Sequence, residues 1–195
     1  MLVDGHQGGR RVPALVLRGR AFYGGTAFGA PIGGWDTSSV TTMYFAFRDA
    51  AAFDADISAW DVSKVTTLQK TFRGAAAFDA DIGDWDVSKV TTLQGTFRGA
   101  AAFDAPIGDW NTTSVTDMYA AFMDASTFDA DIGGWDVSRV TTMYAAFFGA
   151  AAFNANLGAW GVSQVTNFEL MFDGAIDLET CPSWAPAEAS CVGPP

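Results

Sequence analysis

The sequence predicts an α/β repeat solenoid, in which each of six 25-residue units forms a short strand followed by a short helix. The first observation is the period itself, because an aromatic pair recurs every 25 residues without an insertion. A fixed period in this range is typical of folds in which one unit stacks on the next. The phenylalanines are Phe28, Phe53, Phe78, Phe103, Phe128 and Phe153, and the tryptophans are Trp35, Trp60, Trp85, Trp110, Trp135 and Trp160.

This period defines the predicted organisation of the chain as one domain. Each phenylalanine is taken as position 1 of its unit, so that every unit has the same 25 positions. Terminal units of a stack are usually atypical because they cover its open ends. The predicted segments are an N-terminal cap with a degenerate half-repeat (1–27), six repeats (28–52, 53–77, 78–102, 103–127, 128–152 and 153–177) and a C-terminal cap and tail (178–195).

The second observation is the apolar spacing in the second half of each unit. Val65, Leu68 and Phe72 fall at i, i+3 and i+7, which is the spacing of one helix face. Ser63 is a suitable N-cap, with Asp61 as a competing candidate. A helix over 64–73 is therefore predicted, with Gly74 as the left-handed residue that ends it.

The third observation concerns the first half of each unit, where a short strand is predicted. Position 4 holds proline in two units, at Pro31 and Pro106. Proline cannot donate to a strand ladder, so this position belongs in a turn. The segment that remains for a strand is 57–61, with Ile57 and Trp60 turned into the core.

The repeated aromatic side chains are predicted to form core ladders and not a ligand groove. They recur as near-identical columns at positions 1, 5, 8, 13, 16 and 20 of the units. A ligand site is normally unique, whereas a stack of equivalent units needs the same buried contact at every step. One unit cannot bury its own apolar face, so stability is expected to depend on stacking.

The charge distribution excludes several function classes. The net charge is −11 and is unevenly distributed. Residues 1–20 hold four basic residues, Arg10, Arg11, Arg18 and Arg20, and one acid, Asp4, so residues 21–195 carry 7 − 21 = −14. An acidic body repels phosphate, which argues against nucleic-acid binding. No apolar run reaches the roughly 18 residues of a membrane span, so no membrane insertion is expected. The N-terminal apolar stretch is broken by Pro13 and does not match a secretory signal.

No catalytic residues are predicted. The single histidine, His6, lies outside the repeats, so neither a Ser-His-Asp nor a Cys-His arrangement can form within them. Paired carboxylates recur in D-A-D motifs such as Asp54/Asp56. A glycosidase needs two carboxyl groups in different environments, and copies of one exposed motif do not supply that difference.

Calcium is the one cofactor that the sequence leaves open. In a regular stack the carboxylates of position 2 would lie ~5 Å apart and repel one another, and a cation with oxygen ligands would relieve this. The spacing matches no EF-hand loop, and local turn hydrogen bonds are the alternative role for these side chains. The candidate ligands are Asp54, Asp79, Asp104 and Asp129.

The two cysteines, Cys181 and Cys191, both fall in the C-terminal cap. Their separation suits a small disulfide loop, and without neighbouring histidines they make a poor metal site. A disulfide would imply an oxidising compartment, and two free thiols are the alternative.

The positions that vary between units mark a candidate interaction face. Repeat proteins bind along extended surfaces, and several of the variable side chains are aromatic or apolar enough for a contact patch. Ordinary surface drift would produce the same variation. The candidate residues are Tyr44, Arg48, Arg73, Arg98, Tyr119, Met123, Tyr144 and Phe148.

The motif W-D-V-S-x-V-T, at 60–66, 85–91 and 135–141, followed by F-x-G-A-x-x-F-x-A-x-I, resembles a known repeat. It is similar to the BspA-type leucine-rich-repeat-like family, specifically the 25-residue repeat of unknown function in mycoplasma surface lipoproteins. The resemblance covers about residues 15–178. It implies a leucine-rich-repeat-like right-handed coil on a secreted or cell-surface protein, often adhesive, with no catalytic residues.

Together these observations predict a non-enzymatic repeat protein that acts in protein–protein or cell-surface interaction along an extended face. The alternative is a calcium-stabilised structural repeat without a dedicated partner. An extracellular or cell-surface location is what the resemblance implies.

Overall fold

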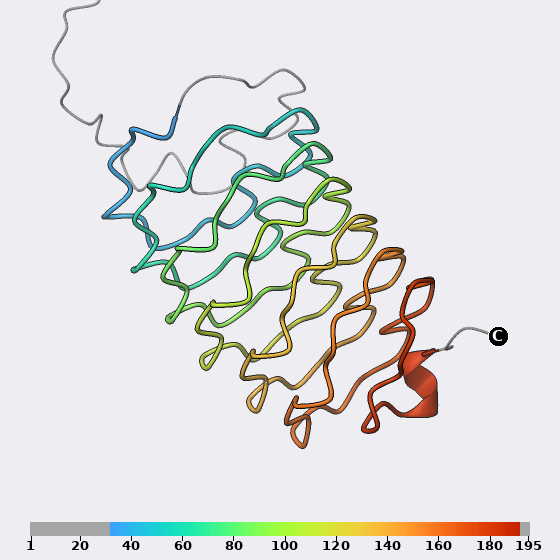
Figure 1. The fold of residues 1–195 in the computed structure, drawn as a ribbon. Helices are drawn as coiled ribbons and strands as arrows, with labels where there is room; N and C mark the ends of the chain where they lie inside the picture. Colours follow the sequence, from blue (N-terminus) through green and yellow to red (C-terminus); the bar gives the residue numbers. More distant parts are fainter. Residues whose placement is uncertain (1–31, 192–195) are drawn as a thin grey trace, which may run out of the picture.

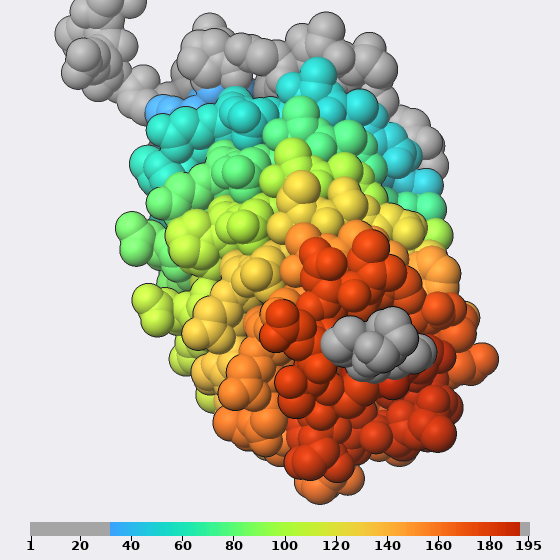
Figure 2. Space-filling view, turned by 45° about the vertical axis from the view of Figure 1, so that its right-hand side comes forward, coloured from blue at the N-terminus to red at the C-terminus, as the bar shows by residue number. Residues whose placement is uncertain are grey.

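The computed structural model describes residues 32–191. In this part of the chain the backbone runs in coils of 25 residues that stack in sequence order from residue 32 to the C-terminal end (Figure 1). Figure 2 shows the same coils as successive coloured bands. The predicted N-terminal cap (1–27), with His6, the first residues of the first repeat and the last four residues of the chain lie outside the described residues.

The predicted α/β solenoid of strand-plus-helix units is wrong. The only helix among residues 32–191 is the 3₁₀-helix η1, Ala187–Ala189, and this part of the chain contains no extended strand. Between pairs of residues within 32–191, the β-type bridges are isolated, parallel and at position 15. They join Thr92 to Asp117, Asp117 to Thr142, and Thr142 to Asn167.

The predicted helix over 64–73 does not form because its amide groups bond between coils. The N–H groups of Leu68, Lys70 and Phe72 each donate to the carbonyl oxygen 24 residues later, at 3.4, 2.9 and 2.9 Å. An α-helix would need the same groups to donate to the carbonyl four residues earlier. Backbone groups must be satisfied when buried, and here the next coil satisfies them.

Two left-handed residues in each unit also interrupt helical geometry. Lys70 at position 18 has φ 55° and Gly74 at position 22 has φ 70°. Left-handed backbone is costly for most residues and cannot continue a right-handed helix. The same two positions have positive φ in every described unit, at Phe45, Asp49, Lys70, Gly74, Gly95, Gly99, Ala120, Asp124, Ala145, Gly149, Leu170 and Gly174.

A chain of tight turns explains the helix-like apolar spacing. The amide of Val65 donates to the carbonyl of Val62 (2.8 Å), and that of Ala75 donates to Phe72 (3.0 Å). Each such turn brings an apolar side chain back to the core after three residues, which is close to the three- and four-residue steps of a helix face. The periodicity therefore reports burial correctly but not the type of element.

The predicted strand over 57–61 is likewise a turn, closed by the amide of Trp60 on the carbonyl of Ile57 (3.1 Å). The predicted caps have a different role too. Oδ1 of Asp61 accepts hydrogen bonds from the amide (3.0 Å) and the hydroxyl (2.6 Å) of Ser63. This is an Asx-type turn, which aspartate favours outside helices.

Aromatic ladders fill the core, as the sequence predicts. Phe97 stacks on the equivalent rings of both neighbouring coils, Phe72 at 5.7 Å and Phe122 at 5.3 Å between ring centroids. It also stacks on Phe103 at 3.9 Å. The indole N–H of Trp110 donates to the carbonyl of Ile82 in the preceding coil (3.0 Å), and this bond recurs along the tryptophan column.

The C-terminal segment covers the last coil by imitating the next one. Trp184 stands one position early in the sequence, yet its ring stacks on Trp160 (6.3 Å, 7°) and its N–H donates to the carbonyl of Leu157 (2.9 Å). The amides of Leu170 and Phe172 donate to the carbonyl oxygens of Glu188 and Ala189, both in η1. Two of the carbonyl partners that a seventh coil would supply are therefore replaced.

A disulfide closes this segment. Cys181 and Cys191 are bonded, with a Cα–Cα distance of 5.8 Å. The bond joins the first residues of the cap to the residues just after η1. It therefore fixes the return of the chain across the end of the stack.

Substitution at position 22 tests the left-handed turn. We expect Gly99→Ala to lower the free energy of unfolding by about 1–2 kcal/mol, since a Cβ at φ 71° carries the left-handed penalty while meeting only ordinary contacts. Gly134→Ala is the matched control, because that glycine has open space for a Cβ and a position where other units have alanine. Equal denaturation midpoints for the two variants would contradict this account.

Candidate interaction face

The side chains at positions 17 and 21, together with Phe45 and Lys70 at position 18, lie on one surface of the stack, here called the variable face (44–148). Ala120 and Ala145, also at position 18, are buried. The rings of Tyr44 and Phe45 are 3.9 Å apart, and the guanidinium of Arg48 lies 4.8 Å from the centroid of the Phe45 ring. The ammonium of Lys70 in the next coil lies 5.4 Å from the same ring. These contacts join the three positions within a coil and across to the next one.

The backbone keeps these columns in register. The carbonyl oxygens at positions 17 and 21 accept amide hydrogen bonds from the preceding coil, as Gln94 does from Lys70 (2.9 Å) and Arg98 from Gly74 (2.7 Å). Equivalent side chains in neighbouring coils therefore lie one coil spacing apart, ~4.8 Å where the pairing is parallel. A regular array of side chains on a rigid scaffold results.

The N-terminal half of the variable face is basic. It carries Arg48, Arg73 and Arg98 in one column, with Lys70 beside them. Burial lowers the pKa of Lys70, and the neighbouring Arg73, Arg48 and Arg98 lower it further. Arg48 also pairs with Asp49 (Nε to Oδ2 3.1 Å). Sequence reasoning missed Lys70, whose left-handed backbone conformation the sequence does not reveal.

The C-terminal half is aromatic and apolar. Tyr119 and Tyr144 stack with ring centroids 5.0 Å apart and an interplanar angle of 12°. The Tyr119 side chain is 38% exposed, and Met123 and Phe148 are half-buried beside the pair. The structure therefore brings seven of the eight predicted residues into two groups by chemistry, a division that the sequence analysis did not make.

Tyr44 is separated from the tyrosine pair by two glutamines at the same position. The side-chain amide of Gln69 hydrogen-bonds to that of Gln94 in the next coil. This amide pair lies within the basic half, in the same two coils as Arg73 and Arg98. The three tyrosines consequently do not form one aromatic patch.

The aspartates proposed as calcium ligands act as hydrogen-bond acceptors between coils. Oδ1 of Asp54 accepts from the amide of Asp79 (3.0 Å), Asp79 from that of Asp104 (2.8 Å), and Asp104 from that of Asp129 (2.8 Å). Within 32–191, no three His, Cys, Asp or Glu side chains are placed to hold a metal ion. The calcium hypothesis stays a prediction.

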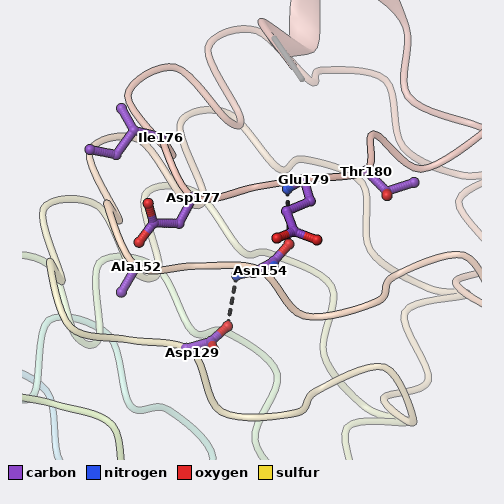
Figure 3. A pocket seen from close by; sticks show the side chains of 7 residues that line it. All are labelled: Asp129, Ala152, Asn154, Ile176, Asp177, Glu179 and Thr180. Atoms are coloured by element: carbon purple, nitrogen blue, oxygen red, sulfur yellow. Dashed lines mark hydrogen bonds between the residues drawn. The ribbon is translucent and has the colours of Figure 1, made fainter. Parts of the chain in front are cut away.

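An open hollow of about 700 Å³ lies at the end of this aspartate column (Figure 3). Two hydrogen bonds cross it, from the amide of Asn154 to Asp129 and from the amide of Glu179 to Asn154. Ile176 at its edge is 75% exposed. The lining residues are Asp129, Ala152, Asn154, Ile176, Asp177, Glu179 and Thr180.

The Asx-type turns hold several carboxylates in their ionised form. The hydroxyl of Ser63, and then its amide, lower the pKa of Asp61, and the same pair of bonds acts on Asp56, Asp86 and Asp136. Because the folded pKa lies below the unfolded value, this stabilisation is present above the unfolded pKa. It is lost as the pH falls through the folded pKa.

Removing the hydroxyl tests this cause. We expect Ser63→Ala to raise the pKa of Asp61 toward its ordinary value, as measured by NMR titration of its carboxyl carbon. Ser163→Ala is the control, since Gly161 stands where the other units have Asp or Asn. An unchanged Asp61 titration in Ser63→Ala would show that the hydroxyl is not the cause.

The turn-rich coils, the aromatic ladders and the variable face define a class of repeat protein in which the backbone itself bonds each unit to the next. The chain belongs to the family described as Mycoplasma protein of unknown function, DUF285, which matches residues 18–105 and 68–185. No curated protein and no solved structure matches the chain. Within the described residues, no helix has both the length and the apolar composition to cross a bilayer.

Proposed function

We propose that the protein is a non-enzymatic binding protein that holds a protein partner along the variable face. One observation carries this proposal: a stacked, solvent-accessible tyrosine pair and a column of arginines lie on the same regular surface. Tyrosine and arginine are the residues most often enriched where proteins bind proteins.

The internal variation of the repeat supports the choice of this face. Positions that face the core are nearly invariant from unit to unit, as in the column Phe47, Phe72, Phe97, Phe122, Phe147 and Phe172. Position 17 instead carries tyrosine, glutamine or glutamate, and position 21 carries arginine, methionine, phenylalanine or aspartate. The fold does not require one side chain at these positions, so they are free to serve recognition.

A location at the cell surface is part of the proposal. The Cys181–Cys191 disulfide is typical of proteins in oxidising compartments. The resemblance to BspA-type surface proteins, often adhesive, points the same way. Such proteins bind partners outside the cell.

Selection from a phage-displayed random peptide library tests the proposal. Peptides selected on the wild-type protein are expected to bind the double variant Tyr119→Gln/Tyr144→Gln at least tenfold more weakly, measured by biolayer interferometry. Glutamine is the native residue at this position in two other units, which preserves the fold. The control is Asp109→Ala, at an exposed position where Ala59 and Ala159 occur. Selected peptides that bind all three proteins equally would overturn the proposal.

A further inference from the structure

We infer that the segment bound on the variable face is an extended peptide with acidic side chains at one end and apolar side chains at the other. This inference rests on the proposed function and adds the chemistry of the partner. It follows from the division of the face into a basic half and an aromatic half.

Charge complementarity indicates the acidic end. In the three coils of the basic half, positions 17, 18 and 21 hold four cations and no acid. Arg48 of this cluster also pairs with Asp49, one position further along its coil. Residues 21–195 as a whole carry a charge of −14, so this cluster is a local exception. An acidic segment is steered to such a patch and away from the rest of the surface.

The other half of the face excludes an acidic continuation. Beyond the pair of Tyr119 and Tyr144, the same columns continue with Glu169 and Asp173, which are exposed. Carboxylates of the partner would meet like charge there. Apolar side chains instead meet the tyrosine edges, Met123 and Phe148, which favours burial of aliphatic or aromatic groups.

The orientation of the rings favours a peptide over a saccharide. Sugars bind aromatic side chains by lying on an open ring face. One face of Tyr119 lies on one face of Tyr144, so the two inner ring faces are closed to a sugar, while the ring edges and hydroxyl groups remain available to a peptide. The Phe45 ring is covered by Arg48 and Lys70. Hydroxyl groups and ring edges suit the carbonyl groups and apolar side chains of a peptide.

The length of the face sets the length of the segment. Arg48 and Phe148 are four coil steps apart, which at ~4.8 Å a step is ~19 Å. An extended chain rises ~3.3 Å per residue, so about six residues span the face. A segment of this length can place acidic side chains over the arginines and apolar ones over the tyrosines at the same time.

The test compares two labelled peptides of one composition by fluorescence anisotropy. The block peptide has four glutamates followed by Leu-Phe-Leu-Phe, and the second peptide alternates the same residues. We expect the block peptide to bind at least tenfold more tightly and to weaken as NaCl is raised from 50 to 200 mM. Arg73→Gln/Arg98→Gln is expected to reduce its affinity at least tenfold.

A matched control separates the face from net charge. Lys64→Ser/Lys89→Ser removes the same two charges at position 12, where Ser39 and Ser114 occur naturally, and is expected to leave binding unchanged. This inference is overturned if the block and alternating peptides bind the wild-type protein with equal affinity. If Tyr119→Gln/Tyr144→Gln then binds neither peptide, the proposed function still stands. Tighter binding of heparin, abolished by Arg73→Gln/Arg98→Gln, would overturn the peptide class. If the library peptides bind Tyr119→Gln/Tyr144→Gln as tightly as the wild-type protein, the proposed function itself is overturned.

Discussion

Replacing Phe97 with alanine is expected to lower the free energy of unfolding by about 3–5 kcal/mol, the range for a buried phenylalanine. The side chain is fully buried in the middle of the stack. Its ring is stacked on Phe72, Phe103 and Phe122, so its loss leaves a cavity bordered on both sides by rings that the backbone bonds hold in place.

Position in the stack determines the size of this effect. Phe172 in the last repeat stacks on Phe147 in the preceding coil but has only the tilted ring of Trp184 on the side of the cap. Phe172→Ala is therefore expected to cost less than Phe97→Ala. Tyr119→Gln, on the surface, removes one stacked aromatic pair and should lower stability by about 0.5–1.5 kcal/mol.

Urea unfolding followed by tryptophan fluorescence measures all three variants. In a repeat protein each unit contacts only its neighbours. A substitution in a central coil therefore weakens the contact between the two halves of the stack, whereas one in the last coil promotes unfolding of that end alone. An equal loss for Phe97→Ala and Phe172→Ala would show that the ladder does not couple the coils in this way.

The core could be predicted from the sequence because burial is a property of the repeat and not of the element type. A column such as Phe47 to Phe172 must be buried in any stack with a 25-residue period. The helix over 64–73 could not be excluded, since turns that close after three residues produce nearly the same apolar spacing. The sequence evidence against a helix was at position 18. This position holds Phe45, Lys70, Gly95 and Ala120, which share no preference for a helix.

The candidate site was predictable as a set of positions but not as a geometry. Variation at positions 17 and 21 is visible in the sequence, whereas the stacking of Tyr119 on Tyr144 requires the coil register. Lys70 was missed because a left-handed backbone, which the sequence does not show at a lysine, turns it toward Phe45. The aspartates of position 2 are adjacent, as expected, but they accept amide hydrogen bonds from the following coil.

Replacing both cysteines, as Cys181→Ser/Cys191→Ser, is expected to lower the free energy of unfolding by about 2–4 kcal/mol, the usual range for a native disulfide. The bond closes a loop with a sequence separation of 10 residues, and that loop carries the groups that cover the last coil. Without it, Trp184 and Ala189 lose the constraint that returns the chain to the end of the stack.

The loss of stability should affect the C-terminal end of the stack before it affects the other coils. Hydrogen-exchange mass spectrometry is expected to show faster exchange at the amides of Leu170 and Phe172, which donate to the cap, and unchanged exchange at Phe97, whose amide donates to Ala121. A reducing agent should reproduce this pattern in the wild-type protein and have no further effect on the double variant. If the amides of Leu170, Phe172 and Phe97 all exchanged faster by the same factor, the cap would be stabilising the whole stack. The coils would then unfold as a single cooperative unit and not one after another from the C-terminal end.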